Sequence, residues 1–308
     1  MRFTTLIDAA SLGKLLQEHP RQLVLLDCRF DLGNPDAGRQ AYAEGHVPGA
    51  RYADLNRNLA APITAHSGRH PLPAPDQLLG FFASVGVEPD TQVVAYDEAN
   101  GAFAARAWWL LRWLGHSQAA VLDGGYRAWV AAGGAVEAGG AVEVGHTREN
   151  GLDGTPAGTT PRPATAGDAP VMQSGLAQPV TSAEVVEALQ DTRRVLVDAR
   201  APERFAGATE PIDPVAGHVP GAVNHPFSRN LDSQSRFLPP AELRQRWLER
   251  LDGKSPGDVI LMCGSGVTAC HNALAMEIAG LGGAKLYAGS WSEWIRNPER
   301  PVARGAAS

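Results

Sequence analysis

The residue in this chain best placed for covalent chemistry is a cysteine that follows a short apolar run. Val259 to Met262 fit a buried strand, Cys263 comes next, and two glycines and small residues lead from it into a helical pattern. Backbone N–H groups in such a turn, with the positive end of a helix that begins near Thr268, favour the reactive thiolate. The alternative is an ordinary buried thiol. The two glycines allow the backbone to approach the sulfur closely, so we interpret Cys263 as a nucleophile.

The cysteine belongs to the second copy of a unit that the chain contains twice. The first segments that recur are Leu25–Arg29 with Gly45–Ala50, and Leu196–Arg200 with Gly217–Ala222, where the hexapeptide Gly-His-Val-Pro-Gly-Ala is identical. The later ones are Val93–Asp97 with Leu122–Trp129, and Val259–Cys263 with Tyr287–Trp294. Asp97 therefore occupies the position of the cysteine in the first copy. The hexapeptide is present in both copies, so we interpret it as architectural, with His218 bonded to its own loop.

Each copy alternates short apolar runs with helical patterns, which predicts a parallel sheet covered by helices on both faces. The predicted strands are Leu23–Asp27, Gln92–Asp97, Ala119–Leu122, Val195–Asp198, Asp258–Met262 and Lys285–Tyr287, and the predicted helices include Asp76–Val85 and Ala104–Leu114. The fold class is therefore α/β, in two tandem domains. We predict an N-terminal domain over residues 1–145, a linker rich in Gly, Pro and Thr over 146–178, and a C-terminal domain over 179–308.

The composition and charge of the chain exclude some classes of binding partner. The 308 residues carry 27 basic and 33 acidic side chains, a net charge of −6, and no long basic run, so neither nucleic acid nor an anionic membrane is an expected partner. No stretch is long enough to span a membrane, and the N-terminus meets Asp8 before an apolar core of signal length develops. Three cysteines make no disulfide framework and fit a reducing compartment, so we expect a cytoplasmic location.

A duplicated unit whose second copy carries Cys-Gly-Ser-Gly-Val-Thr-Ala after a strand resembles the tandem rhodanese-fold sulfurtransferases. These include thiosulfate and 3-mercaptopyruvate sulfurtransferases, and the resemblance covers the whole chain apart from the linker. It implies a catalytic second copy and a site between the two domains. It also implies a two-step transfer in which Cys263 takes the outer sulfur of a small anionic donor as a persulfide. A thiol, cyanide or a thioredoxin-like protein then accepts the sulfur, with no metal and no organic cofactor.

The loop after the cysteine is the predicted cradle for the sulfur and the donor. Its N–H groups, from Gly264, Ser265, Gly266, Val267 and Thr268, stabilise thiolate and persulfide. The hydroxyls at 265 and 268 reach the same space, although they would equally serve as helix caps. We favour the serine as a catalytic group.

The resemblance favours 3-mercaptopyruvate over thiosulfate as the sulfur donor, on the residues of the loop and of two arginine positions. Thiosulfate enzymes typically place an arginine and a lysine after the cysteine, whereas this loop has the mercaptopyruvate pattern. Arg204 matches a family arginine for the donor carboxylate, and its alternative is a surface ion pair with Glu203 or Glu210. The second family arginine is replaced by Ile212, which cannot bind a carboxylate. Arg69, in a segment that runs near the domain interface in this family, is a candidate replacement, although most loop arginines are simply solvated.

The resemblance also implies an aspartate and a histidine from the first copy that assist the loop serine in general acid–base chemistry. Asp36 and His46 are the positions that match by order. Two further cysteines, Cys28 and Cys270, fall on apolar patterns and are interpreted as core residues rather than redox partners.

Two other classes of protein remain to be weighed. Cysteine phosphatases share a cysteine between strand and helix, but they need an arginine six residues later, where this chain has Ala269. A carrier module would hold a persulfide for a partner without turnover. The intact loop favours the enzyme over this carrier.

Overall fold

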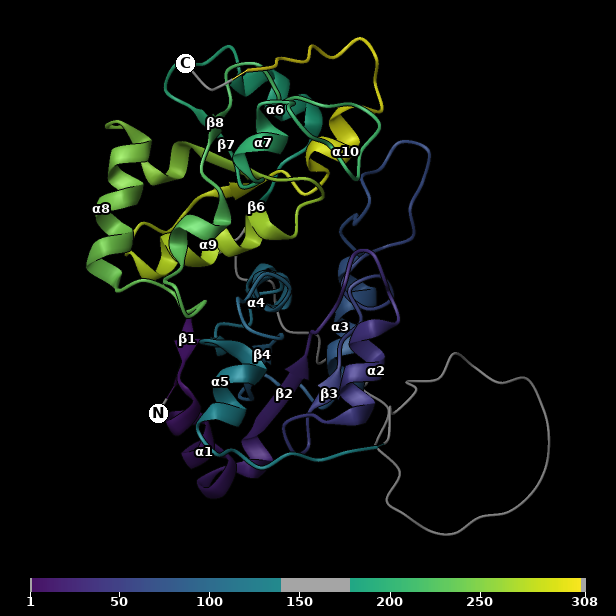
Figure 1. The fold of residues 1–308 in the computed structure, drawn as a ribbon, viewed down its shortest axis with the longest axis vertical. Coiled ribbons are helices and arrows are strands. Elements are labelled where there is room, and N and C mark those ends of the chain that lie inside the picture. The colour runs from purple at the N-terminus through teal and green to yellow at the C-terminus, as the bar shows by residue number, and fades with distance from the viewer. Residues whose placement is uncertain (1, 140–177, 306–308) are drawn as a thin grey trace, which may run out of the picture.

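A computed structural model describes residues 2–139 and 178–305, which form two parallel five-stranded sheets (Figure 1). The first sheet has the order β1-β5-β4-β2-β3 and the second β6-β10-β9-β7-β8, so the two halves share one topology. The strands are β1 Leu6–Ile7, β2 Leu23–Asp27, β3 Arg51–Tyr52, β4 Gln92–Tyr96, β5 Ala119–Leu122, β6 Gln178–Pro179, β7 Val195–Asp198, β8 Val223–Asn224, β9 Val259–Met262 and β10 Lys285–Leu286. The predicted duplication and fold class are confirmed.

Helices cover both faces of each sheet. They are α1 Ala9–Glu18, α2 Ala37–Glu44, α3 Pro75–Ser84, α4 Ala104–Trp113, α5 Gly125–Ala131, α6 Ser182–Ala188, α7 Pro202–Phe205, α8 Pro240–Leu251, α9 Thr268–Ile278 and α10 Ser290–Trp294, with short 3-10 helices η1 Pro20–Gln22, η2 Phe227–Asn230 and η3 Pro256–Asp258. The strands and helices predicted from periodicity end within one residue of those observed.

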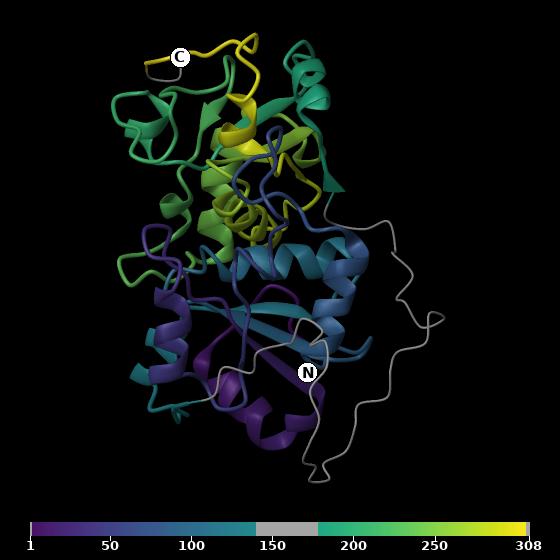
Figure 2. The same cartoon turned by 90° about the vertical axis from the view of Figure 1, so that its right-hand side faces the viewer.

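The core is continuous from one sheet to the other. One apolar cluster lies between the two sheets and joins side chains of α3 and α4 to those of α8 and α9. Two smaller clusters cover the outer faces, one on each sheet. Nine of the ten residues of α4 and eight of the eleven residues of α9 are buried, as expected for helices enclosed on all sides. Figure 2 shows α4 lying across the boundary between the lower and upper halves.

The repeated hexapeptide has a structural role in both copies, as predicted. His218 Nδ1 lies 2.8 Å from the Phe205 carbonyl oxygen, and its ring stacks on that phenyl ring at 3.8 Å. The arginine of the Asp-Xaa-Arg motif, Arg29 in the first copy and Arg200 in the second, has the same two partners in both copies. It donates to the aspartate of the motif and to the carbonyl of the hexapeptide's first glycine. Each arginine also lies over an aromatic ring of the helix after the last strand. The hexapeptides therefore fix the loops at the carboxyl edge of each sheet.

The predicted linker, residues 146–178, lies outside the described residues except for Gln178, where β6 begins. Within the two described ranges, no helix is both long and apolar enough to cross a bilayer.

Candidate active site

Cys263 directly follows β9, and the loop from it leads into α9. Its side chain is 2% exposed, and the Gly266 N–H donates to the sulfur at 3.1 Å. The helix begins at Thr268, so the positive end of an eleven-residue helix faces this turn. Both features stabilise negative charge on the sulfur.

A short segment at the start of α10 holds the backbone of this loop. The Cys263 N–H donates to the Ser290 hydroxyl at 3.0 Å, and the Cys263 carbonyl accepts from the Trp291 N–H at 3.0 Å. Gly266 has a φ of +77°, and a Cβ there would meet the Ala288 carbonyl. Only glycine fits that position without strain. The loop is therefore preorganised by its own domain before any donor arrives.

The first copy contains the same loop with a carboxylate in place of the thiol. The Tyr126 N–H donates to the Asp97 carbonyl at 2.8 Å, which repeats the bond between Trp291 and Cys263. The Asp97 side chain accepts from four backbone N–H groups, those of Ala99, Gly101, Phe103 and Ala104, at 2.9 to 3.2 Å. Burial raises its pKa, against the effect of these bonds. The predicted equivalence of Asp97 and Cys263 is confirmed, and the first cradle is already filled.

A loop of the first half, drawn in blue between β3 and α3, reaches up beside the second half (Figures 1 and 2). It carries His70, whose Nδ1 lies 2.7 Å from the Ser265 hydroxyl. Both side chains are buried. Burial, with the charges of Arg106 and Arg69, lowers the pKa of His70 to about 3. The imidazole is therefore neutral at physiological pH and shares a hydrogen bond with the serine hydroxyl.

Arg106 of α4 fastens that loop to the cysteine loop. Its fully buried guanidinium donates to the carbonyls of Leu59 and His70 at 3.3 and 3.1 Å, and to Gly266 of the second half at 3.2 Å. The His70–Ser265 pair and this arginine join the two halves at the cysteine loop.

Two arginines, one from each half, meet above the residue that follows the nucleophile. A Cβ built on Gly264 would lie 2.9 Å from Arg69 Nη2 and 3.6 Å from both terminal nitrogens of Arg204. Asp213 holds the pair, since one of its oxygens bonds to Arg69 and the other accepts from Arg204 at 3.2 Å. Arg204 also pairs with Glu210, at 2.7 Å, which is one of the two partners named in the alternative interpretation, although the Glu210 side chain is buried.

Both guanidinium groups keep free donors on the side of the loop. Within the described residues, Arg69 Nη2 and Nε and Arg204 Nη1 donate to no protein acceptor. Ile212, at the position of the family's second arginine, is 43% exposed. Arg69 thus places a second guanidinium beside that of Arg204.

The prediction that Asp36 and His46 assist the serine is wrong about position, because both lie elsewhere and the histidine beside the serine hydroxyl is His70. His46 Nδ1 lies 2.8 Å from the Tyr42 carbonyl, and its ring stacks on Tyr42, as the hexapeptide histidine of the second copy does on its own loop. Asp36 is exposed and pairs with Arg39 at the start of α2. The signal available in the sequence was His70 itself, next to Arg69 in a segment predicted to run near the interface.

The remaining loop residues and cysteines have plain structural roles. Val267 and Thr268 start α9, and neither side chain caps it. Cys270 donates to the Gly266 carbonyl from inside the core, and burial raises its pKa to about 12. Cys28 is buried as well, and burial raises its pKa. The interpretation of both as core residues is confirmed.

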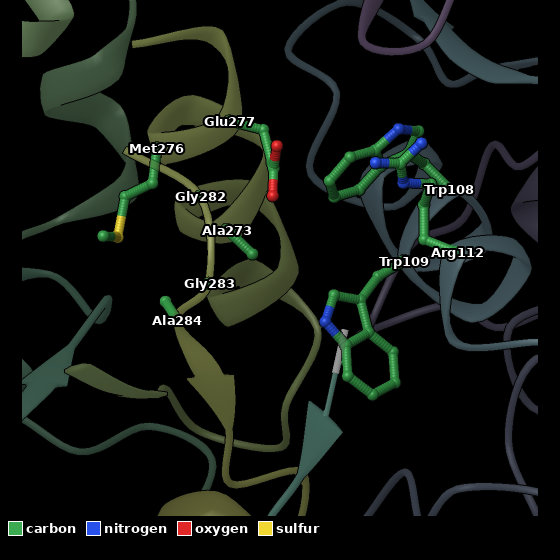
Figure 3. Close-up of a pocket in the computed structure, with 9 residues that line it drawn as sticks. All are labelled: Trp108, Trp109, Arg112, Ala273, Met276, Glu277, Gly282, Gly283 and Ala284. Carbon is green, nitrogen blue, oxygen red and sulfur yellow. The ribbon is translucent and has the colours of Figure 1, made fainter. Parts of the chain in front are cut away.

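A second contact between the halves lies between α4 and α9. Figure 3 shows Glu277 of α9 facing Trp108 and Arg112 of α4. Burial raises the pKa of Glu277, and the Arg112 charge opposes that shift. The space between them is about 10 Å³, enough for no more than one water molecule. It is a packing gap and not a donor site.

The model of the rhodanese-like domain matches residues 8–132 and 181–297. The chain is 46% identical, over 307 residues, to a probable 3-mercaptopyruvate sulfurtransferase of Pseudomonas aeruginosa. The match covers 99% of this chain and all of that protein. It is 33% identical to the thiosulfate sulfurtransferase of Rattus norvegicus, with 92% of this chain and 89% of the rat protein covered. Among solved structures, the 3-mercaptopyruvate sulfotransferase SseA of Escherichia coli superposes with a TM-score of 0.71 at 29% identity, with 94% of this chain and all of that chain covered.

Proposed function

The chain belongs to the rhodanese family of sulfurtransferases, and from this premise we propose that it moves a sulfane sulfur from 3-mercaptopyruvate to a thiophilic acceptor through a persulfide on Cys263. The acceptor is cyanide, a small thiol or a protein dithiol of the thioredoxin type. The catalytic domain is residues 179–308, and residues 1–145 form the domain that supplies the opposite wall of the site.

The observation that carries this proposal is the pair of arginines above Gly264. A donor that places its sulfur at Cys263 has its carboxylate within reach of Arg69 and Arg204, which retain unused N–H groups there. Two guanidinium groups suit bidentate recognition of a carboxylate. Asp213 keeps both in place without occupying those donors.

In the first half-reaction, the Cys263 thiolate forms a bond to the donor sulfur and the carbon–sulfur bond of the donor breaks. The electron pair of that bond goes to carbon, which gives the enolate of pyruvate, and the proton of the donor thiol ends on that carbon. In the second half-reaction, the acceptor attacks the outer sulfur, the S–S bond breaks and the thiolate returns. The N–H groups of the loop stabilise the anionic sulfur in both half-reactions.

Ser265 and His70 are proposed to carry the proton between donor thiol and enolate. The neutral imidazole shares a hydrogen bond with the serine hydroxyl through Nδ1, so the hydroxyl can take up one proton as it gives up another without the imidazole becoming charged. Ser265 and His70 are buried, so bulk water has little access to protonate the enolate in their place. Loss of the hydroxyl should slow loading of the sulfur more than its discharge.

The decisive experiment compares loading and turnover with two donors. Wild type, Cys263→Ser and Arg69→Ala are assayed with 3-mercaptopyruvate and with thiosulfate, using cyanide and a dithiol as acceptors. We expect no turnover in Cys263→Ser, a higher kcat/KM for 3-mercaptopyruvate than for thiosulfate in wild type, and a loss of that preference in Arg69→Ala. Arg193→Gln, an exposed arginine paired with Asp191, is the matched control.

The outcomes separate the alternatives. A preference for thiosulfate would make the protein a thiosulfate:cyanide sulfurtransferase that uses the same cysteine. Loading by one sulfur, seen by mass spectrometry, without steady-state turnover would indicate a persulfide carrier. Full activity in Cys263→Ser would refute the nucleophile. Because all three cysteines are free thiols, we infer that the protein works in a reducing compartment such as the cytoplasm.

A further inference from the structure

A second polar depression lies in the C-terminal half, on residues that the sulfur-transfer site does not use. It is lined by His225, which follows β8, by Arg229 of η2, and by Arg246, Glu249 and Arg250 of α8. Its volume is about 330 Å³, within the range of small-molecule sites. In Figure 1, α8 lies at the outer edge of the upper half.

The depression carries an excess of positive charge. Three arginines face one glutamate there, a balance of +3 − 1 = +2 when the histidine is neutral. Arg246 is already paired, with Glu242 at 2.6 Å, and also donates to the Arg229 carbonyl at 2.9 Å. Within the described residues, Arg229 and Arg250 form no ion pair. Burial, and then the charge of Arg229, lower the pKa of Arg250, as expected for a cation without a counter-ion.

Unsatisfied buried nitrogens are concentrated in the same place. In the described part of the chain, three buried side-chain nitrogen or oxygen atoms have no hydrogen-bond partner: Arg69 Nε, His225 Nδ1 and Arg250 Nε. The first lies at the donor site. The other two belong to residues that line this depression, and His225 is 2% exposed. Buried polar atoms are rarely left unpaired, so each of these two calls for a partner that the described chain does not supply.

The tautomer of His225 indicates what kind of anion fits. Asn230 Oδ1 accepts from Trp247 Nε1 at 3.1 Å, so this oxygen must also accept from His225 Nε2 at 3.2 Å. With the proton on Nε2, Nδ1 is an acceptor. Burial, together with the three arginines, lowers the pKa of His225 to about 4, which keeps the ring neutral. A fitting ligand therefore combines acceptor oxygens for arginine with an O–H for His225.

We propose that this depression binds a phosphate group, with the oxygens held by Arg229 and Arg250 and the P–O–H donated to His225 Nδ1. Hydrogen phosphate and a singly protonated phosphate monoester both have the required acceptors and the donor. Sulfate has comparable size and charge but carries no proton at neutral pH. The group can come from free phosphate or from a phosphorylated metabolite, and the binding chemistry is the same.

Isothermal titration calorimetry with inorganic phosphate, at constant ionic strength in chloride, tests the site. We expect one saturable site per chain and weaker binding of sulfate. Arg250→Gln and Arg229→Gln should each weaken phosphate binding roughly tenfold or more, since each removes a charged hydrogen bond. Arg193→Gln loses the same charge from an exposed position of the same half and should bind phosphate as wild type does.

A further variant locates the binding. Arg204→Gln alters the donor site and should leave phosphate affinity unchanged. Loss of binding in Arg204→Gln, with retention in Arg250→Gln, would place phosphate at the donor site and overturn the proposal. So would the absence of saturable binding, or equal affinity for sulfate. Failure of the phosphate site would leave the persulfide assay unaffected, so the two proposals are judged separately.

The 15N chemical shifts of the histidine side chains provide a readout at the acceptor atom. Addition of phosphate should move the His225 Nδ1 resonance in the direction of a hydrogen-bonded nitrogen, and the resonance should stay in place in Arg250→Gln. Glycerol 3-phosphate in the same titration separates the two sources. Tighter binding than inorganic phosphate indicates a phosphorylated metabolite, and weaker binding indicates the free ion. An unchanged Nδ1 shift under saturating phosphate would refute the role of His225.

Discussion

Gly264 should be a sensitive reporter of the donor site, because the space beside it is where the donor carboxylate is proposed to lie. A methyl group at this position would sit 2.9 Å from Arg69 Nη2 and 3.6 Å from the terminal nitrogens of Arg204. The distance to Arg204 is an ordinary contact. The distance to Arg69 is too short, and Arg69 would have to move away by about 0.5 Å if about 3.4 Å is the closest normal contact. The backbone of Gly264 is not in the left-handed region, so alanine is tolerated there.

The expected magnitude follows from the bonds that the methyl displaces. A hydrogen bond to a charged group contributes about 1.5–3 kcal/mol, and Gly264→Ala should remove at least one between Arg69 and the donor. The value of kcat/KM for 3-mercaptopyruvate should therefore fall roughly 10- to 150-fold. The loss belongs to loading of the sulfur. Discharge of the preloaded persulfide to cyanide should proceed at the wild-type rate.

Stopped-flow measurement of the two half-reactions checks this, with urea unfolding as the test of the fold. Gly266→Ala is the matched control, because its φ of +77° and its contact with the Ala288 carbonyl make alanine strained there. We expect that variant to lose about 2 kcal/mol or more of unfolding free energy, and Gly264→Ala to lose little. An unchanged loading rate in Gly264→Ala, or a defect confined to discharge, would refute the placement of the carboxylate.

Three further predictions concern the proton relay, acid stability and the first cradle. Ser265→Ala should slow persulfide loading from 3-mercaptopyruvate by about 10²-fold or more, as judged by rapid-quench mass spectrometry, and an unchanged rate would exclude the relay. Below about pH 6.5 the unfolded chain should bind protons that the folded chain refuses, so the unfolding free energy should fall by up to about 1.4 kcal/mol per pH unit for each histidine whose folded pKa lies well below its unfolded value. These histidines are His70, His225 and His271, whose pKa values burial lowers to about 3, about 4 and about 3. Urea titrations between pH 7 and 5 measure this, and replacing the exposed His66 by glutamine should leave the slope as it is. Asp97→Ala should cost about 3 kcal/mol or more, because it leaves four backbone N–H groups, two of them buried and two partly buried, without an acceptor, and a smaller loss of stability in urea would mean that other groups satisfy them.

The fold could be predicted from the sequence because its signals are local. Apolar runs such as Leu23–Asp27 and Val195–Asp198 have the length and flanks of buried strands, and both ends were placed as observed. The duplication added a second, independent copy of each signal. It also aligned Asp97 with Cys263, an equivalence that two matching backbone bonds confirm.

The site was predicted in part, and the part that was missed depends on contacts distant in sequence. Cys263 and its cradle lie within one loop, so spacing alone describes them. The partner of Ser265 is 195 residues away, and order along the chain favoured His46 over His70. His46 belongs to the repeated hexapeptide, and a residue that recurs in the copy with the nucleophile and in the copy without it has a structural role in both. Position in a chain does not tell which of two histidines a loop of about twenty residues carries to the other half.

The phosphate-binding depression shows the same limit on another surface. Arg246 and Arg250 are four residues apart on α8, a pattern that in sequence is typical of a solvated helix face. Their relation to His225 arises only when η2 and β8 pack beside that helix. In the folded chain His225 is buried, and its Nδ1 is an acceptor to which no described residue donates.

The guanidinium of Arg106 links the two halves at the cysteine loop, so sulfur transfer should depend on their docking. It belongs to the half without a nucleophile, and it bonds both to the loop that carries His70 and to the carbonyl of Gly266, the residue whose N–H contacts the sulfur. The catalytic loop therefore depends on its neighbour for stiffness as well as for donor contacts. Two polypeptides made by cutting the chain between the sheets would recover sulfur transfer only as they associate. Activity would then rise with the concentration of both pieces, and the rate would report how often the halves are docked.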